Sequence, residues 1–204
     1  MPRASCSARS PADGGGAGLS PPPGGEPAEL PHRGVLVVAC GNTLRGDDAA
    51  GPAVGELLAA RLAGTGASVI VSDQLLPELA DDASRARLLV IVDAAVDRPA
   101  GSVSVRAVLP RPVTDGVGVE GRADGAAVRS LDPFSHGMGP EDLLALTRDL
   151  YAAAPAAVLV SVGAESFEPG AELTEGVRLA VPRAVDVVLH TIHEGAQGVS
   201  TPDA

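Results

Sequence analysis

The stretch VLVVACGNTLRGDDAAG, residues 35–51, decides the fold. Six apolar residues run directly into Gly41, which is typical of a strand buried on both faces of a sheet. A polar turn follows and ends in two adjacent aspartates, Asp47 and Asp48. Neighbouring carboxylates repel each other, so the pair either caps a helix or holds a positive group. A helical pattern then begins, with Pro52 in its first turn.

The same alternation of strand and helix continues along the chain. Apolar strands are predicted at 34–40, 68–73, 87–96 and 156–164, and an alternating edge strand at 101–109. Helices are predicted after Pro52, over 76–86, from Pro140 and after Thr174, and Pro182 is expected to kink or divide the last one. This rhythm predicts a doubly wound α/β sandwich.

The apolar pattern also sets the domain boundaries. Residues 1–33 are rich in Pro and Gly and have almost no large apolar side chains, so a disordered tail is expected there. Residues 34–194 form one domain, and residues 195–204 are expected to be disordered as well.

Composition excludes several classes of function. The net charge is −11, which argues against nucleic acid and anionic membranes as partners. The chain contains no lysine, so neither a Schiff-base lysine nor a phosphate-binding lysine is available. No apolar run is long enough for a membrane helix. Only two cysteines are present, too few for a disulfide framework, so a reducing cytoplasm is the expected location.

Polar side chains gather where the predicted strands end. Ligands of open α/β sheets bind beyond the carboxyl ends of their strands, so we expect these side chains to meet. The candidates are Asn42, Asp47, Asp48, Asp73, Glu78, Asp93, Asp97, Asp132, His136, Glu165 and Glu168. Two carboxylates and an imidazole suit a divalent ion of the nickel or zinc type.

Simpler roles compete with metal binding at these positions. Asp47 or Asp48 can cap the following helix, and Asp93 can cap the turn after its strand. His136 lies between glycines and prolines, where an ordinary surface histidine is common. Cys40 adjoins the carboxylates, which are expected to raise its pKa and make it a poor nucleophile.

Five segments together resemble the hydrogenase maturation protease family. In order they read GVLVVACGNTLRGDDAAGPAV, VIVSDQLLPELA, LLVIVDAAV, SHGMGPEDLLAL and VSVGAESFEPGAELTEGV, and they span roughly residues 34–192. The resemblance implies a three-layer α/β sandwich with a twisted, mostly parallel five-stranded sheet and helices on both faces. It also implies an endopeptidase, classed as aspartic-type, that removes a C-terminal peptide from the large-subunit precursor of NiFe hydrogenase after nickel insertion.

The resemblance also assigns roles to individual residues. Asp48, Asp93 and His136 fall on the family's metal-binding positions, which contact the nickel of the precursor and carry the catalysis. Asn42, Asp47 and Asp73 are expected to support the substrate or the loops. The first acid is commonly glutamate in the family but is Asp48 here, and the turn DQLLPE replaces a frequent DGGT, which leaves the hydrogenase subtype open.

Several alternatives remain open from the sequence. A carboxylate or a metal-polarised water can assist the attack on the peptide bond. A nickel-sensing chaperone that binds the precursor without cutting it is the second hypothesis, and a nucleotide-binding module of the same fold class is the third. No organic cofactor is expected, and the protein is expected to act as a monomer.

Overall fold

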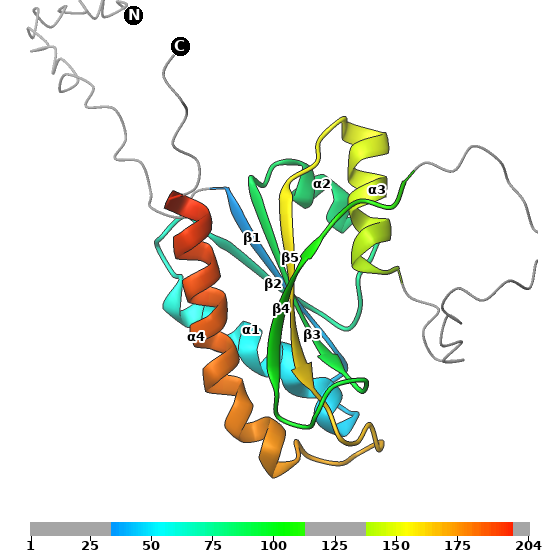
Figure 1. The fold of residues 1–204 in the computed structure, drawn as a ribbon, viewed down its shortest axis with the longest axis vertical. Helices are drawn as coiled ribbons and strands as arrows, with labels where there is room; N and C mark the ends of the chain where they lie inside the picture. The colour runs from blue at the N-terminus through cyan, green and yellow to red at the C-terminus, as the bar shows by residue number, and fades with distance from the viewer. Residues whose placement is uncertain (1–33, 113–137, 198–204) are drawn as a thin grey trace, which may run out of the picture.

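The computed structural model describes residues 34–112 and 138–197, which form five strands and the helices around them (Figure 1). In chain order the elements are β1 (Val35–Cys40), the 3₁₀ turn η1 (Gly46–Ala49), α1 (Ala50–Arg61), β2 (Ser68–Ser72), α2 (Leu79–Ser84), β3 (Leu88–Ala95), β4 (Val103–Val108), α3 (Pro140–Tyr151), β5 (Ala156–Gly163) and α4 (Glu175–Gln197). None of the described helices is long and apolar enough to cross a membrane.

The five strands form one sheet in the order β2-β1-β3-β5-β4. Neighbouring strands are parallel from β2 to β5, and β4 pairs antiparallel with β5 at the edge. The predicted mostly parallel sheet and the predicted edge strand are therefore confirmed. Because β1, β2, β3 and β5 run in the same direction, their carboxyl ends meet at one edge of the sheet.

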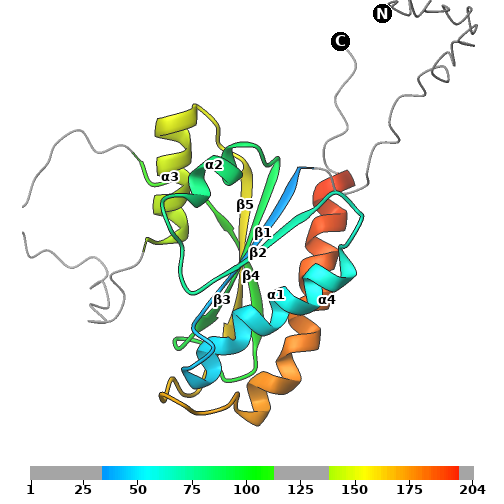
Figure 2. The ribbon, with the colours of Figure 1, turned by 180° about the vertical axis from the view of Figure 1, so that it is seen from behind.

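Helices cover both faces of the sheet, as the views from the two sides show (Figure 2). In β1, Val35, Val37 and Ala39 face the core beneath α1 and α4. The alternate residues Leu36, Val38 and Cys40 face the core beneath α2 and α3. All six residues of β1 are buried, which explains why this strand reads as an unbroken apolar run.

Helix α1 approaches the sheet closely at Gly55. A Cβ atom at this position would lie 2.6 Å from Ala39 Cβ and 2.8 Å from Val71 Cγ2. The absent side chain therefore sets the spacing between α1 and the strands β1 and β2. This contact positions the start of α1, and with it η1, at the carboxyl edge of the sheet.

Helix α4 differs from the expectation in two respects. It runs unbroken from Glu175 to Gln197 although Pro182 lies inside it, so of the two predicted effects of Pro182, a kink or a division, the division does not occur. The exposed position of Pro182 and the buried side chains on either side of it, including Val181 and Val185, explain how packing outweighs the lost backbone bond. The helix also continues past the expected boundary at residue 194, whereas the predicted tail 1–33 lies outside the described residues.

The first testable consequence concerns Gly55. Gly55→Ala should lower the free energy of unfolding by about 1–2 kcal/mol, because overpacking against Ala39 and Val71 outweighs the ~1 kcal/mol gain in helix propensity. Gly176→Ala is the matched control, since its Cβ would meet a single atom at 4.0 Å. Urea unfolding followed by circular dichroism measures both; equal stability of the two variants would contradict the close approach.

Candidate active site

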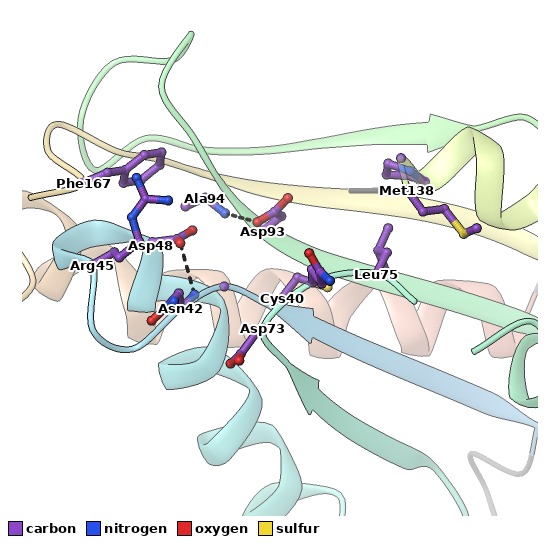
Figure 3. Close-up of a pocket in the computed structure, with 14 residues that line it drawn as sticks. Cys40, Asn42, Arg45, Asp48, Asp73, Leu75, Asp93, Ala94, Met138 and Phe167 are labelled. Carbon is purple, nitrogen blue, oxygen red and sulfur yellow. Dashed lines mark hydrogen bonds between the residues drawn. The ribbon is translucent and has the colours of Figure 1, made fainter. Parts of the chain in front are cut away.

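A pocket of about 600 Å³ opens at the carboxyl edge of the sheet. It lies where the segments after β1, β2 and β5 approach the end of β3 and the start of α3 (Figure 3). Its lining residues are Cys40, Gly41, Asn42, Arg45, Asp48, Asp73, Gln74, Leu75, Asp93, Ala94, Met138, Gly139, Pro140 and Phe167. Four of the predicted site residues, Asn42, Asp48, Asp73 and Asp93, therefore line one cavity.

Asp48 enters the pocket from η1 and is held by the turn before it. Its Oδ2 accepts a hydrogen bond from the backbone N–H of Asn42 at 3.1 Å, and Asn42 Oδ1 accepts one from Leu44 N–H at 2.9 Å. A Cβ at Gly41 would lie 1.9 Å from the Asp48 carbonyl oxygen, and Gly41 has φ +139°. Only glycine allows the chain to turn this tightly beneath Asp48.

Asp47 points away from this cavity and into the protein. Its side chain is fully buried and accepts four hydrogen bonds from the segment between β5 and α4. Oδ2 receives the N–H groups of Glu165 at 2.8 Å and Ser166 at 3.1 Å and the Thr174 hydroxyl at 3.1 Å, while Oδ1 receives Thr174 N–H at 2.7 Å. Burial alone raises the pKa of Asp47, but these bonds outweigh it and hold the pKa below its ordinary value.

Neither aspartate caps the helix that follows it. The caps of η1 and α1 lie at Arg45 and Ala49 and have no side-chain hydrogen bond, so the capping hypothesis for the pair is wrong. The physical reason is that η1 intervenes between the turn and α1. Asp47 serves instead as an anchor for the β5–α4 segment, whose backbone also bonds the turn through Gly170 N–H to the Leu44 carbonyl at 2.7 Å.

Asp93 lies within β3, two residues before its end, and reaches the pocket beside Asp48. Burial raises the pKa of Asp93 to about 7, and the charge of Asp48 adds to this effect. The backbone N–H of Ala94, at 2.9 Å, opposes it in part. Among the described residues, the carboxylate of Asp93 accepts its hydrogen bond from Ala94 within the strand, so it does not cap the turn after β3.

Cys40 shares the pocket with these two aspartates and is buried as a free thiol. Burial raises its pKa to about 12, and the charges of Asp93 and Asp48 contribute. The expectation that Cys40 is a poor nucleophile is confirmed, and burial contributes more to its raised pKa than the neighbouring charges do. The neutral thiol forms an apolar part of the pocket wall.

Asp73 follows β2 and lines the outer part of the pocket, where its side chain is exposed. The strand end beside it is fixed to the β1 turn, because Gly41 N–H donates to the Ser72 carbonyl at 3.1 Å. Gln74 and Leu75 continue the same wall. The first three residues of the segment DQLLPE thus border the cavity directly.

His136 lies outside the described residues, so its predicted place in the site stays a prediction. The described chain resumes at Met138, and Met138, Gly139 and Pro140 all line the pocket. Within residues 34–112 and 138–197, no group of three histidine, cysteine or acidic side chains is arranged to hold a metal ion. Asp48 and Asp93 supply two carboxylates, so a third ligand must come from elsewhere.

Arg45 and Phe167 also line the pocket, and neither is among the site residues predicted from the sequence. Arg45 stands in the same turn as Asp48, and Phe167 stands between Glu165 and Glu168, the acids predicted from the end of the last strand. The aromatic ring lines the cavity and the two glutamates do not. The sequence feature that could have indicated Arg45 is its position three residues before Asp48, in the turn that leads to the site.

The two adjacent aspartates should respond differently to mutation. Asp47→Asn should lower the free energy of unfolding by about 2–3 kcal/mol, because the buried amide group would face the N–H of Thr174 instead of accepting from it. Asp48→Asn should change it by less than about 1 kcal/mol, since Asp48 is half-buried and accepts a backbone hydrogen bond from Asn42. Urea titration of both variants tests this contrast, and similar losses in the two would contradict it.

Asp93 should give the stability of the metal-free protein a distinctive pH dependence. The pKa of Asp93 is about 7 in the folded protein and near 4 in the unfolded chain. Between these two pH values the folded protein keeps the proton of Asp93, whereas the unfolded chain has released it. Stability therefore falls by a few kcal/mol as pH rises from about 4 to about 7 and is level above that range.

The control is Asp93→Asn, which should flatten the profile over this range. Asp47 acts in the opposite direction and at lower pH, because its lowered pKa gives stability that is lost as pH falls below about 4. Thermal unfolding with a chelator present reports the Asp93 effect between about pH 4 and 8, and the same measurement continued below about pH 4 reports the Asp47 effect. The same slope in wild type and Asp93→Asn would refute the assignment.

Comparison with known proteins identifies the fold. No family model matches the sequence, and no curated protein matches it. A NiFe hydrogenase maturation protease HycI from Thermococcus kodakarensis aligns at 18% identity over 80% of this chain and 93% of its own, with a TM-score of 0.59. The hydrogenase maturating endopeptidase HybD from E. coli aligns at 24% over 78% and 92%, with a TM-score of 0.57.

A hydrogenase 2 maturation peptidase from a Thaumarchaeota archaeon is similar as well. It aligns at 25% identity over 78% of this chain and 97% of its own, with a TM-score of 0.51. All three alignments cover most of both chains. The expected resemblance is therefore confirmed at the level of the fold, and this chain has the α/β fold of the hydrogenase maturation proteases.

Proposed function

We propose that this protein is an endopeptidase that removes the C-terminal extension of the NiFe hydrogenase large-subunit precursor after nickel has been inserted. The observation that carries the proposal is the pairing of Asp48 and Asp93 in one pocket at the carboxyl edge of the sheet. The fold shared with proteins named maturation proteases supports the choice of substrate. The acidic pocket also suits a positively charged feature of the substrate, such as a bound nickel ion.

The pocket has the size and polarity that a peptide substrate requires. A volume of about 600 Å³ lies within the range of about 300–1,000 Å³ typical of ligand sites. One part is lined by the carboxylates of Asp48, Asp73 and Asp93, and another by Leu75 and Met138. A short stretch of extended chain can therefore place apolar side chains and a peptide bond in the same cavity.

Asp48, Asp93 and His136 are the proposed contacts to the nickel of the precursor. Asp93 is half-way through titration near pH 7, so a divalent cation displaces its proton and draws the carboxylate into the site. Without nickel in the precursor, about half of the Asp93 side chains keep their proton near pH 7, and the substrate lacks this contact. That difference provides a physical reason for cutting the nickel-loaded precursor in preference to the empty one.

A water molecule attacks the peptide bond once the precursor is docked. In one route a pocket carboxylate accepts a proton from the water, and in the other coordination to the metal makes the water acidic enough to lose it. The two routes make the same products. The aspartic-type classification corresponds to the first route. We further propose that the enzyme works as a monomer in the cytoplasm, where the free Cys40 thiol is stable.

Incubation with the nickel-loaded precursor, followed by mass spectrometry, tests the function. Wild type should shorten the precursor by one C-terminal peptide and leave the nickel-free precursor intact. Asp48→Asn, Asp93→Asn and His136→Ala should slow this processing by at least about 100-fold. Asp186→Asn on the exposed surface of α4 is the matched control and should process normally.

Three results would count against the proposal. Binding of the precursor without any change in its mass would indicate the non-cleaving chaperone. Equal cleavage of nickel-loaded and nickel-free precursor would remove the role of the metal. Normal processing by His136→Ala would remove the histidine from the site while leaving the peptidase activity established.

A further inference from the structure

Acidic side chains outnumber basic ones among the described residues that line the pocket. Among the described lining residues, Asp48, Asp73 and Asp93 carry carboxylates, and Arg45 supplies the single cationic side chain. A tetrahedral intermediate places a further negative charge on the former carbonyl oxygen. Carboxylates alone would repel that charge and raise the energy of the intermediate. A cation close to the oxygen would therefore stabilise the intermediate strongly in this cavity.

The turn that carries Asp48 also fixes the backbone of Arg45. Arg45 N–H donates to the Asn42 carbonyl at 3.1 Å, and the Arg45 carbonyl accepts from Asp48 N–H at 3.1 Å. The next residue, Gly46, has φ +53°, and its N–H donates to the Ala171 carbonyl at 3.2 Å. Arg45 is thus held on both sides by bonds that also position Asp48.

The side chain of Arg45 lies on the pocket wall near the ring of Phe167. The guanidinium carbon lies 6.0 Å from the centre of the Phe167 ring, at the outer limit of a cation–π contact. Figure 3 shows the guanidinium below this ring, on the side of the pocket from which Asp48 enters. Asp47 accepts hydrogen bonds from the backbone on both sides of Phe167, so a buried contact holds the β5–α4 segment that carries the ring.

We propose that Arg45 is a catalytic residue that donates hydrogen bonds to the carbonyl oxygen of the peptide bond being cut. This inference rests on the proposed endopeptidase function and adds a residue to its machinery. A guanidinium has five N–H donors, so it can contact a neighbouring group and the substrate oxygen at once.

The reaction step can be written with all its atoms. The water oxygen forms a bond to the carbonyl carbon, its proton passes to a pocket carboxylate, and the C=O π pair moves onto the oxygen that Arg45 holds. That pair then re-forms the C=O bond while the C–N bond breaks. The nitrogen keeps the C–N electron pair and takes the proton from the carboxylic acid, giving a new carboxyl terminus and a free amine.

Steady-state cleavage of nickel-loaded precursor by Arg45 variants tests the inference. Arg45→Gln should lower kcat by about 100- to 1,000-fold while KM changes by less than about 3-fold, because the interaction strengthens only in the transition state. Arg45→Lys should recover part of the rate, since it keeps the charge but loses the planar donor pair. Phe167→Leu should cost only about 2- to 5-fold, the magnitude of an exposed cation–π contact.

Two measurements separate catalysis from a structural role. Guanidinium ion, added to Arg45→Ala at concentrations far below those that unfold the protein, should restore part of kcat. Urea unfolding should show that Arg45→Gln is folded. Arg61→Gln is the matched control: it removes the same charge at the far end of α1, in an exposed pair with Asp186, and should leave kcat unchanged.

The possible failures are distinguishable. If wild type processes the precursor and Arg45→Gln does so at the same rate, the role of Arg45 is wrong and the proposed function stands. A rise in KM with an unchanged kcat would make Arg45 a substrate-docking residue and would also overturn the inference. If wild type leaves the nickel-loaded precursor intact, the proposed function fails and the catalytic role of Arg45 fails with it.

Discussion

The site depends on the buried carboxylate of Asp47. It accepts four hydrogen bonds from a segment that lies 118 or more residues further along the chain, and it thereby joins the turn after β1 to the segment between β5 and α4. A carboxylate that receives this many donors is stable in the protein interior, where an unpaired one would be very costly. Because Asp47 points inward, its neighbour Asp48 is free to face the pocket, and the two adjacent acids have different environments.

The pocket combines groups that would disfavour one another in isolation. Burial of Asp93 beside Asp48 raises the pKa of Asp93 to about 7, and the same surroundings keep the Cys40 thiol neutral. This negative environment favours a cation and opposes the oxyanion of peptide hydrolysis. The proposed nickel contact uses the preference for a cation, and the proposed role of Arg45 offsets the repulsion of the oxyanion.

Much of the fold follows from particular segments of the sequence. The unbroken apolar run at 35–40 predicts a central strand because both of its faces are covered. The alternation of apolar and polar residues at 103–108 predicts an edge strand, and three consecutive residues of β4, Val105 to Ala107, are exposed there. The turn after β1 was harder to predict. Helix capping by Asp47 or Asp48 was reasonable from local spacing, but η1 intervenes and Asp47 finds its donors far away in the sequence.

The sequence by itself determined the order of the elements, the mostly parallel sheet and the edge at which Asp48, Asp73 and Asp93 would gather. These features follow from hydrophobic periodicity and from the position of polar residues at strand ends, both of which are local. Only the tertiary structure decided which distant donors hold Asp47, and that Arg45 and Phe167 line the cavity together. The physical reason is that these choices depend on hydrogen bonds and packing between segments more than 100 residues apart, which no local pattern records.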